Sequence, residues 1–183
     1  MKRKVLVTGA NGYVGRHVVK ALLDKGCEVI ASDFKFDGVD ERAQRNTTPI
    51  FSDEENLYEK LGNPDVVVHL AWRNGFVHNA DTHITDLPSH YNFIKKMVDA
   101  KLPQLVVMGT MHEVGYWEGA INGDTPTNPT SMYGIAKNTL REAAYLPLLS
   151  GSFRHFPFHR EDIPVHRKVR SLFLLYPLRW KNG

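Results

Sequence analysis

Two side chains with complementary acid–base character, Tyr133 and Lys137, lie four residues apart in the sequence. On a helix, that spacing puts both side chains on one face. A phenol has an ordinary pKa of about 10, and a neighbouring ammonium group lowers that pKa by stabilising the phenolate. The pair therefore predicts a general acid–base centre, although the same spacing also occurs on the exposed faces of ordinary helices.

Three glycines lie near the start of the chain, directly after the apolar run 5–7. Gly9 permits a tight turn out of a strand, Gly12 lets backbone amides approach a pyrophosphate, and Gly15 lets the next helix pack closely. The amino end of that helix favours anions because its N–H groups are free. The stretch predicts a dinucleotide site, with these residues in contact with the cofactor: Gly9, Asn11, Gly12, Tyr13, Val14 and Gly15.

Asp33 follows a second apolar run, residues 28–32, and lies 18 residues after Gly15. An acidic residue near this position binds the ribose 2′-hydroxyl in dinucleotide sites. A carboxylate there repels a 2′-phosphate, so NAD is expected in preference to NADP, and Lys35 nearby weakens that preference. A turn residue or a helix cap would also explain Asp33 taken alone.

Two further stretches complete a family resemblance. Residues 66–72 read Val-Val-Val-His-Leu-Ala-Trp, and residues 124–129, rich in proline and polar side chains, precede Tyr133. With the glycine stretch and the Tyr-x-x-x-Lys pair, they resemble the extended short-chain dehydrogenase/reductase family. These are NAD-dependent epimerases and dehydratases that act mostly on nucleotide sugars. The resemblance covers about residues 2–142.

The resemblance implies roles for particular residues. Tyr133 would be the general acid/base on a sugar hydroxyl or ketone, and Lys137 would lower its pKa and hold the nicotinamide ribose. Thr110 would donate a hydrogen bond to the reacting oxygen, although another register of the same stretch puts Met111 there. Leu70 and Ala71 would border the cofactor.

Three more residues each have two interpretations. Asp53 follows the expected third strand, where family members often place an acid against the adenine amine, but it also fits a helix N-cap. His112 and Glu113 lie where dehydratases of the family carry an acidic pair. They are either acid–base groups or solvated loop residues.

The spacing of apolar residues predicts an α/β fold, a Rossmann-like doubly wound parallel sheet. Strands are expected at 4–8, 28–32, 49–51, 65–71 and 104–109, and helices at 13–25, 54–61, 88–100 and 132–145. The strand runs are continuously apolar, as in parallel sheets covered on both faces. The helix at 88–100 should bury an apolar stripe of Tyr91, Ile94, Met97 and Val98.

The pattern changes after the helix that carries Tyr133. We therefore expect an NAD-binding Rossmann-like domain at 1–145 and a basic C-terminal segment at 146–183, with one more strand at 172–176. The first 150 residues carry a net charge of −2, whereas residues 151–183 carry +5. The substrate-binding portion of the family is missing or atypical here, which suggests truncation or a shifted reading frame.

Composition narrows the remaining classes of protein. The 183 residues, 42% hydrophobic and 23% charged, suit one globular domain. No apolar stretch approaches the roughly 20 residues that span a bilayer, no signal peptide is recognisable, and Cys27 is the single cysteine, so a cytoplasmic location is expected. The spacing of His78, His83 and His90 fits no compact ligand set, so no metal is expected.

These features predict an NAD-dependent oxidoreductase, epimerase or dehydratase that acts on a nucleotide sugar through Tyr–Lys acid–base chemistry. The alternative is a catalytically inactive NAD-binding fragment or NAD-sensing module, because the substrate-binding portion is not recognisable. A homodimer through the helices at 88–100 and 132–145 is expected by resemblance. Nucleic-acid binding is not, since the basic charge is confined to the tail.

Overall fold

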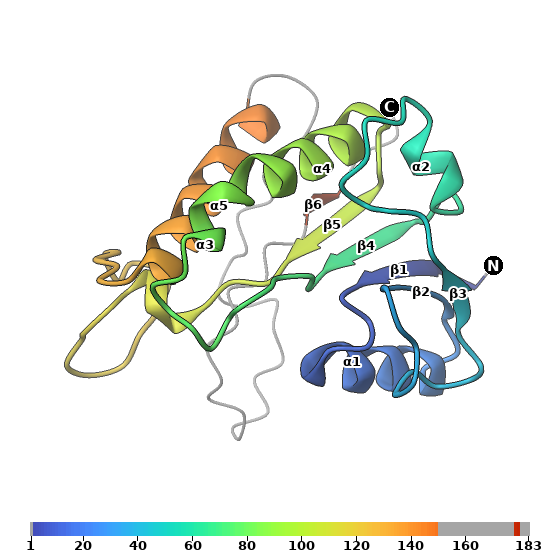
Figure 1. The fold of residues 1–183 in the computed structure, drawn as a ribbon, viewed down its shortest axis with the longest axis horizontal. Coiled ribbons are helices and arrows are strands. Elements are labelled where there is room, and N and C mark those ends of the chain that lie inside the picture. The colour runs from blue at the N-terminus through green and yellow to red at the C-terminus, as the bar shows by residue number, and fades with distance from the viewer. Residues whose placement is uncertain (1, 150–177, 180–183) are drawn as a thin grey trace.

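The computed structural model describes residues 2–149 and 178–179. Its strands form one sheet in the order β3-β2-β1-β4-β5-β6 (Figure 1). The first five strands are parallel, and β6 runs antiparallel to β5. The order in which strands are added to the sheet reverses between β1 and β4, which is where Rossmann folds bind their ligands. The predicted fold class is confirmed, with these strands: β1 Lys4–Thr8, β2 Glu28–Ser32, β3 Gln44–Asn46, β4 Val66–His69, β5 Gln104–Val107 and β6 Leu178–Arg179.

Helices cover both faces of the sheet (Figure 1). Helix α1 (Tyr13–Asp24) lies on one face, and α4 (Leu87–Asp99) and α5 (Met132–Leu149) pack side by side on the other. The remaining helices are short: α2 (Leu57–Lys60), α3 (Thr82–Thr85) and the 3-10 helix η1 (Met111–Glu113). In the described part of the chain, none of the helices has the length and apolar character that crossing a membrane requires.

Alternate side chains of the strands point to opposite faces of the sheet and pack into two separate hydrophobic cores, as expected for a sheet covered on both faces. Val5 and Val7 of β1 pack toward α1, whereas Leu6 packs toward α4 and α5. The stripe predicted for α4 is confirmed, with Ile94 and Met97 fully buried. Its other two members pack against the same core as partly buried side chains.

The third strand lies at Gln44–Asn46, so the predicted strand at 49–51 is wrong. Its residues are polar and mostly exposed, because an edge strand needs only main-chain pairing with β2. The apolar residues that suggested a strand have another use. Ile50 packs against the core under α4, and the Phe51 ring lies 4.7 Å from the His90 ring.

Several element boundaries also differ from the prediction. The helix expected at 54–61 is reduced to α2, and the short helices α3 and η1 had no signal in the sequence. Helix α5 continues through Leu149, beyond its predicted end at 145. The strand predicted at 172–176 lies outside the described residues, and the division into 1–145 and 146–183 stays a prediction.

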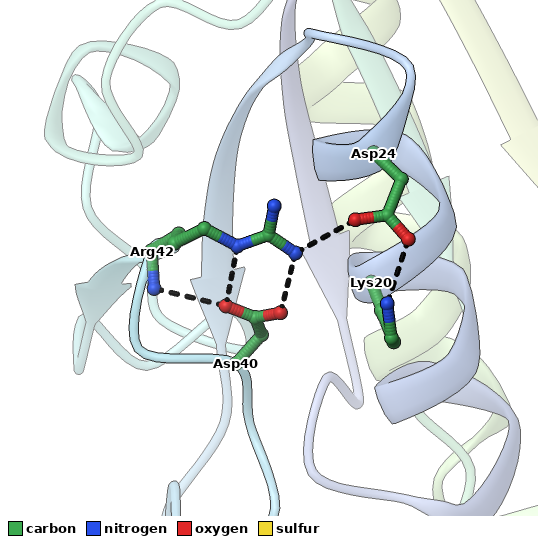
Figure 2. Close-up of polar contacts among 4 residues, drawn as sticks. All are labelled: Lys20, Asp24, Asp40 and Arg42. Carbon is green, nitrogen blue, oxygen red and sulfur yellow. Dashed lines mark hydrogen bonds and ion pairs between the residues drawn. The ribbon is translucent and has the colours of Figure 1, made fainter.

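A group of charged side chains fastens the β2–β3 loop to α1 (Figure 2). The Arg42 guanidinium donates to Asp24 at 2.8 Å and to Asp40 at 2.7 Å, and Asp24 also pairs with Lys20 at 2.7 Å. The hydrogen bonds from Arg42 lower the pKa of Asp40 to about 2. All four groups are solvent-accessible, so they set the position of the loop more than they add stability.

Candidate active site

The glycine stretch forms a turn that leaves no room for side chains at two positions. Gly9 has a φ of +66°, and a Cβ there would lie 2.7 Å from the backbone nitrogen of Ala71. A Cβ at Gly15 would lie 2.1 Å from the carbonyl oxygen of Gly9. The turn can therefore bring the start of α1 against the ends of β1 and β4 only with glycine at both positions.

The end of β2 is tied to this turn by hydrogen bonds. The Asp33 carboxylate accepts from the backbone N–H of Asn11 at 2.8 Å and of Phe34 at 2.7 Å. The Asn11 side-chain oxygen accepts from the Gly38 N–H at 2.8 Å. No helix begins within residues 33–43, so Asp33 is not a helix cap. Its carboxylate stands at the rim of the glycine turn.

The amino end of α1 faces the same rim. Gly12 is its N-cap and provides no side-chain hydrogen bond to the first turn, so N–H groups remain for a ligand. Tyr13 and Val14 expose 74% and 39% of their surface there. Across the turn, the backbone N–H groups of Leu70 and Ala71 donate to the Thr8 hydroxyl oxygen at 3.2 and 3.3 Å. Of the residues predicted to contact the dinucleotide, those of the glycine stretch, Leu70 and Ala71 thus gather at the β1–β4 crossover, with Asp33 beside them at the end of β2.

Tyr133 and Lys137 lie in the first two turns of α5, which packs closely on η1. A Cβ at Gly134 would lie 2.3 Å from the His112 carbonyl oxygen, so this close approach depends on glycine. The Tyr133 N–H donates to the His78 carbonyl at 2.8 Å. Lys137 is 5% exposed and Tyr133 is partly buried, so the pair is not an ordinary exposed pair on a helix surface.

The Lys137 ammonium has two described partners. Its Nζ donates to the Met108 carbonyl at 2.9 Å and lies 4.2 Å from the centroid of the Trp72 ring. Burial lowers the pKa of Lys137 to about 8, and the Glu113 carboxylate acts in the opposite direction. A lysine with this pKa is partly deprotonated near pH 8, so its charge responds to small changes around it.

The pKa of Tyr133 moves in the direction opposite to the one expected from its spacing to Lys137. Burial raises the pKa, Thr110 lowers it through its side chain, and the Glu113 charge raises it. The spacing argument failed because it took no account of burial or of the Met108 carbonyl, which engages the ammonium. With its pKa raised above the ordinary value, Tyr133 is a neutral phenol near pH 7, which is an acid rather than a base.

Thr110 follows β5 and is held by a reciprocal cap. Its N–H donates to the Glu113 carboxylate at 2.8 Å, and its hydroxyl accepts from the His112 N–H at 3.3 Å. Met111, the other candidate for this role, is 58% exposed. Thr110, whose side chain lowers the pKa of Tyr133, is therefore the one positioned beside the phenol.

Glu113 and His112, which follow Thr110 in η1, differ in how exposed they are. Glu113 is 1% exposed, so it is not a solvated loop residue. Its second oxygen lies 3.6 Å from the Arg141 Nε, and burial raises its pKa. The His112 ring is partly exposed and lies 4.2 Å from the His78 ring and 5.5 Å from the Tyr133 ring. The imidazoles of His78 and His112 therefore both border the phenol ring.

Asp53 lies apart from the other predicted site residues. It is exposed and borders a cavity of about 280 Å³ between residues 50–53 and α4. The N-cap interpretation is wrong, because α2 begins only at Leu57 and its N-cap is Asn56. In residues 2–149 and 178–179, no group of three or more His, Cys, Asp or Glu side chains is arranged to hold a metal ion.

The sequence did not indicate one buried cluster beside Tyr133 and Lys137. It consists of Trp72 and three imidazoles from β4, α3 and α4. The Trp72 ring stacks on His90 at 4.3 Å, and His69 bonds to His90 at 2.9 Å. The fourth member, His83, lies with its ring 5.2 Å from Tyr133. Only the histidine-rich composition of residues 69–90 could have signalled it, because the contacts join separate elements.

Comparison with known proteins identifies the family of this chain. A model of the NAD dependent epimerase/dehydratase family matches residues 5–145. A dTDP-6-deoxy-L-talose 4-dehydrogenase (NAD(+)) from Aggregatibacter actinomycetemcomitans is 41% identical over 147 residues, covering 77% of this chain and 54% of the relative.

Solved structures give the same fold. A protein in complex with UDP-glucose and NAD has a TM-score of 0.65 and 26% identity, over 81% of this chain and 50% of that one. UDP-glucose 4-epimerase from Thermotoga maritima, solved with UDP-glucose, has a TM-score of 0.66 and 23% identity, over 79% and 50%. The chain thus spans about half the length of the relatives it matches.

Proposed function

Because the chain belongs to the NAD-dependent epimerase/dehydratase family, we propose that it binds NAD and oxidises a hydroxyl of a nucleotide sugar at Tyr133. One observation carries this proposal. The glycine turn and the Thr110–Tyr133–Lys137 group lie at the carboxyl edge of the same parallel sheet, on opposite sides of the β1–β4 crossover. A dinucleotide that spans this edge would bring its pyrophosphate to one group and its nicotinamide to the other.

The residues of the turn fit such a cofactor. The glycine backbone and the uncapped first turn of α1 suit the pyrophosphate, and the Asp33 carboxylate suits a ribose 2′-hydroxyl. A 2′-phosphate beside Asp33 would meet a negative charge, which favours NAD over NADP. The backbone of Leu70 and Ala71, fixed by Thr8, would form the floor between the two groups.

NAD, when bound, would supply the acceptor for the hydride that leaves the sugar carbon. The chain's own part is proton transfer and positioning. Thr110 would orient the reacting hydroxyl, and Tyr133 in its ionised form would take the hydroxyl proton as the C–O bond becomes a carbonyl. In the reverse direction, the neutral Tyr133 phenol would return that proton. Lys137 would turn its ammonium from Met108 toward the nicotinamide ribose and so favour the phenolate.

A second function is favoured by one observation. The pKa of Tyr133 is raised, not lowered, so the described residues also fit an NAD-binding module without turnover. The two proposals differ in what Tyr133 does. In the enzyme the phenol must ionise once NAD is bound, whereas in the module its ionisation has no consequence.

Relatives suggest the substrate class. Two solved neighbours are described with UDP-glucose, and the talose dehydrogenase is named for a dTDP sugar, so we propose a UDP- or dTDP-linked hexose as substrate. Which of oxidation, epimerisation or dehydration follows is open. A homodimer through α4 and α5 and a cytoplasmic location are further predictions.

The test is a panel of UDP- and dTDP-sugars mixed with NAD, read at the absorbance of NADH. The sugars are also analysed by chromatography, because an epimerase or dehydratase returns the hydride and accumulates no NADH. The enzyme proposal expects NADH or a converted sugar with at least one substrate, and neither with Tyr133→Phe. NAD binding with neither NADH nor a converted sugar would favour the binding module. No NAD binding at all would refute both.

A further inference from the structure

Trp72 stands where the chain leaves β4, directly after the residues that border the dinucleotide turn. The ring meets the Lys137 ammonium with its face, since Nζ lies 4.2 Å from the ring centroid. A cation over an indole face is attracted by the negative face of the π-system, and the attraction is strongest where water is excluded. Lys137 is buried, so this contact is of the strong kind.

The indole is held in place from two sides. Its Nε1–H donates to His83 Nδ1 at 3.0 Å, and the other His83 nitrogen donates to the Val77 carbonyl at 2.9 Å. These two bonds fix one tautomer of His83, with the proton on Nε2. His90 stacks on the indole at 4.3 Å and an angle of 21°. The ring therefore has one position rather than a choice of rotamers.

A hydrogen-bonded chain continues from His90 to the end of β1. The Thr8 hydroxyl oxygen accepts from two backbone N–H groups, so its own proton is directed to His69 Nδ1 at 2.8 Å. His69 then donates from Nε2 to His90 Nδ1 at 2.9 Å. This order requires both imidazoles to be neutral. The strand end that carries the glycine turn is thereby connected to the indole.

We propose that Trp72 is a positioning residue for Lys137, which holds the ammonium by its ring face and keeps it protonated at the edge of the site. The role in turnover rests on the proposed function of Lys137. The contact itself does not, because it joins two side chains of this chain and involves no cofactor atom. The indole thus helps to set the pH at which the lysine loses its charge.

The ring shares this role with two other groups around Lys137. The Glu113 carboxylate of η1 and the Met108 carbonyl favour the ammonium, whereas burial opposes it. The imidazoles of His69 from β4 and His90 from α4 face the lysine, and burial lowers the pKa of each. Both are therefore uncharged at neutral pH and add no charge beside the ammonium. Tyr133, one turn earlier on α5, is a neutral phenol.

The first experiment measures the titration of Lys137 directly. The protein is labelled with ¹³C at lysine Cε, the Lys137 signal is assigned with Lys137→Met, and its shift is followed against pH. Trp72→Leu should move the midpoint down by about one pH unit, because the ring no longer stabilises the ammonium. Trp72→Phe keeps a weaker face and should move it by less. Trp117→Leu, a tryptophan on a loop, should leave it unchanged.

An unchanged midpoint in Trp72→Leu, in protein with a wild-type far-UV spectrum, would overturn the inference. Should that variant fail to fold, Trp117→Phe/Trp180→Phe leaves Trp72 as the single tryptophan, which is excited selectively at the long-wavelength edge of its absorption, where tyrosine hardly absorbs. Its emission should then titrate with the same midpoint and lose this step in Lys137→Met. Emission that does not titrate would equally overturn it. Neither readout needs NAD or a sugar, so the proposed function and this inference can fail separately.

Discussion

The two groups of residues at the sheet edge are built differently. The glycine turn is a backbone structure, in which Gly9 and Gly15 let chain segments approach and Asp33 ties the β2 end to it. The Tyr133 side is made of side chains from β4, α3, α4, η1 and α5, held by rings and hydrogen bonds. A binding surface for a common cofactor can be made from backbone alone, whereas proton chemistry needs side chains whose charge is controlled.

The largest effect is expected at Tyr133, where a substitution should stop the chemistry but leave cofactor binding at the glycine turn intact. Tyr133→Phe should lower turnover of any active nucleotide sugar by about 10²- to 10⁴-fold, the range for loss of a general acid–base group. NAD affinity should stay nearly constant, because the ring remains. Parallel measurement of kcat and of the NAD Kd separates the two effects. Full activity in this variant would remove Tyr133 from the mechanism.

Acid should lower the folding stability of the protein through the buried histidines near Tyr133. Burial lowers the pKa of His90 to about 4 and that of His69 well below its ordinary value, so the unfolded chain binds more protons than the folded one. Stability is therefore complete above about pH 6.5 and falls as pH drops toward 4, with roughly 3 kcal/mol lost at pH 4 from His90 alone.

The check is urea unfolding at several pH values. His90→Gln should reduce the acid loss, whereas His17→Gln, which changes an exposed imidazole on α1, should not. Equal acid loss in wild type and His90→Gln would mean that the buried imidazole pair does not govern it.

The glycine turn, by contrast, should be sensitive to added side-chain atoms rather than to pH. Gly15→Ala places a methyl group 2.1 Å from the Gly9 carbonyl oxygen and should cost roughly 1–3 kcal/mol of stability and most NAD affinity. Gly75→Ala is the matched control, because a Cβ there meets nothing within 4 Å. Thermal melts and NAD titrations of both variants measure the contrast. Similar behaviour of the two alanines would contradict the packing argument.

The difference between the backbone-built turn and the side-chain-built group around Tyr133 explains which features could be predicted from the sequence. The strands β1 and β2, the turn and Asp33 follow from glycine spacing and apolar runs, which are local signals. The four-residue spacing suggested Tyr133 and Lys137 as an acid–base pair, and the resemblance assigned roles to both and to Thr110. The partners of Lys137, namely Trp72 and the Met108 carbonyl, depend on packing between distant segments and had no local signal. The polar strand β3 was missed because edge pairing leaves no apolar pattern.

The smallest effect concerns cofactor choice. Asp33→Asn removes the charge that opposes a 2′-phosphate, so the preference for NAD over NADP should narrow by about tenfold. The amide keeps an oxygen to accept from Asn11, so the turn should persist. Fluorescence titration with NADH and NADPH measures the ratio. Equal affinity for both cofactors in the wild type would refute the role of Asp33.

Hydrogen–deuterium exchange with and without NAD tests most directly whether the two groups form one cofactor site. Our account predicts that NAD slows exchange both in the glycine turn, residues 9–14, and in the loops at 70–73 and 108–113, which border Tyr133. Protection confined to the turn, or absent from both regions at saturating NAD, would contradict it.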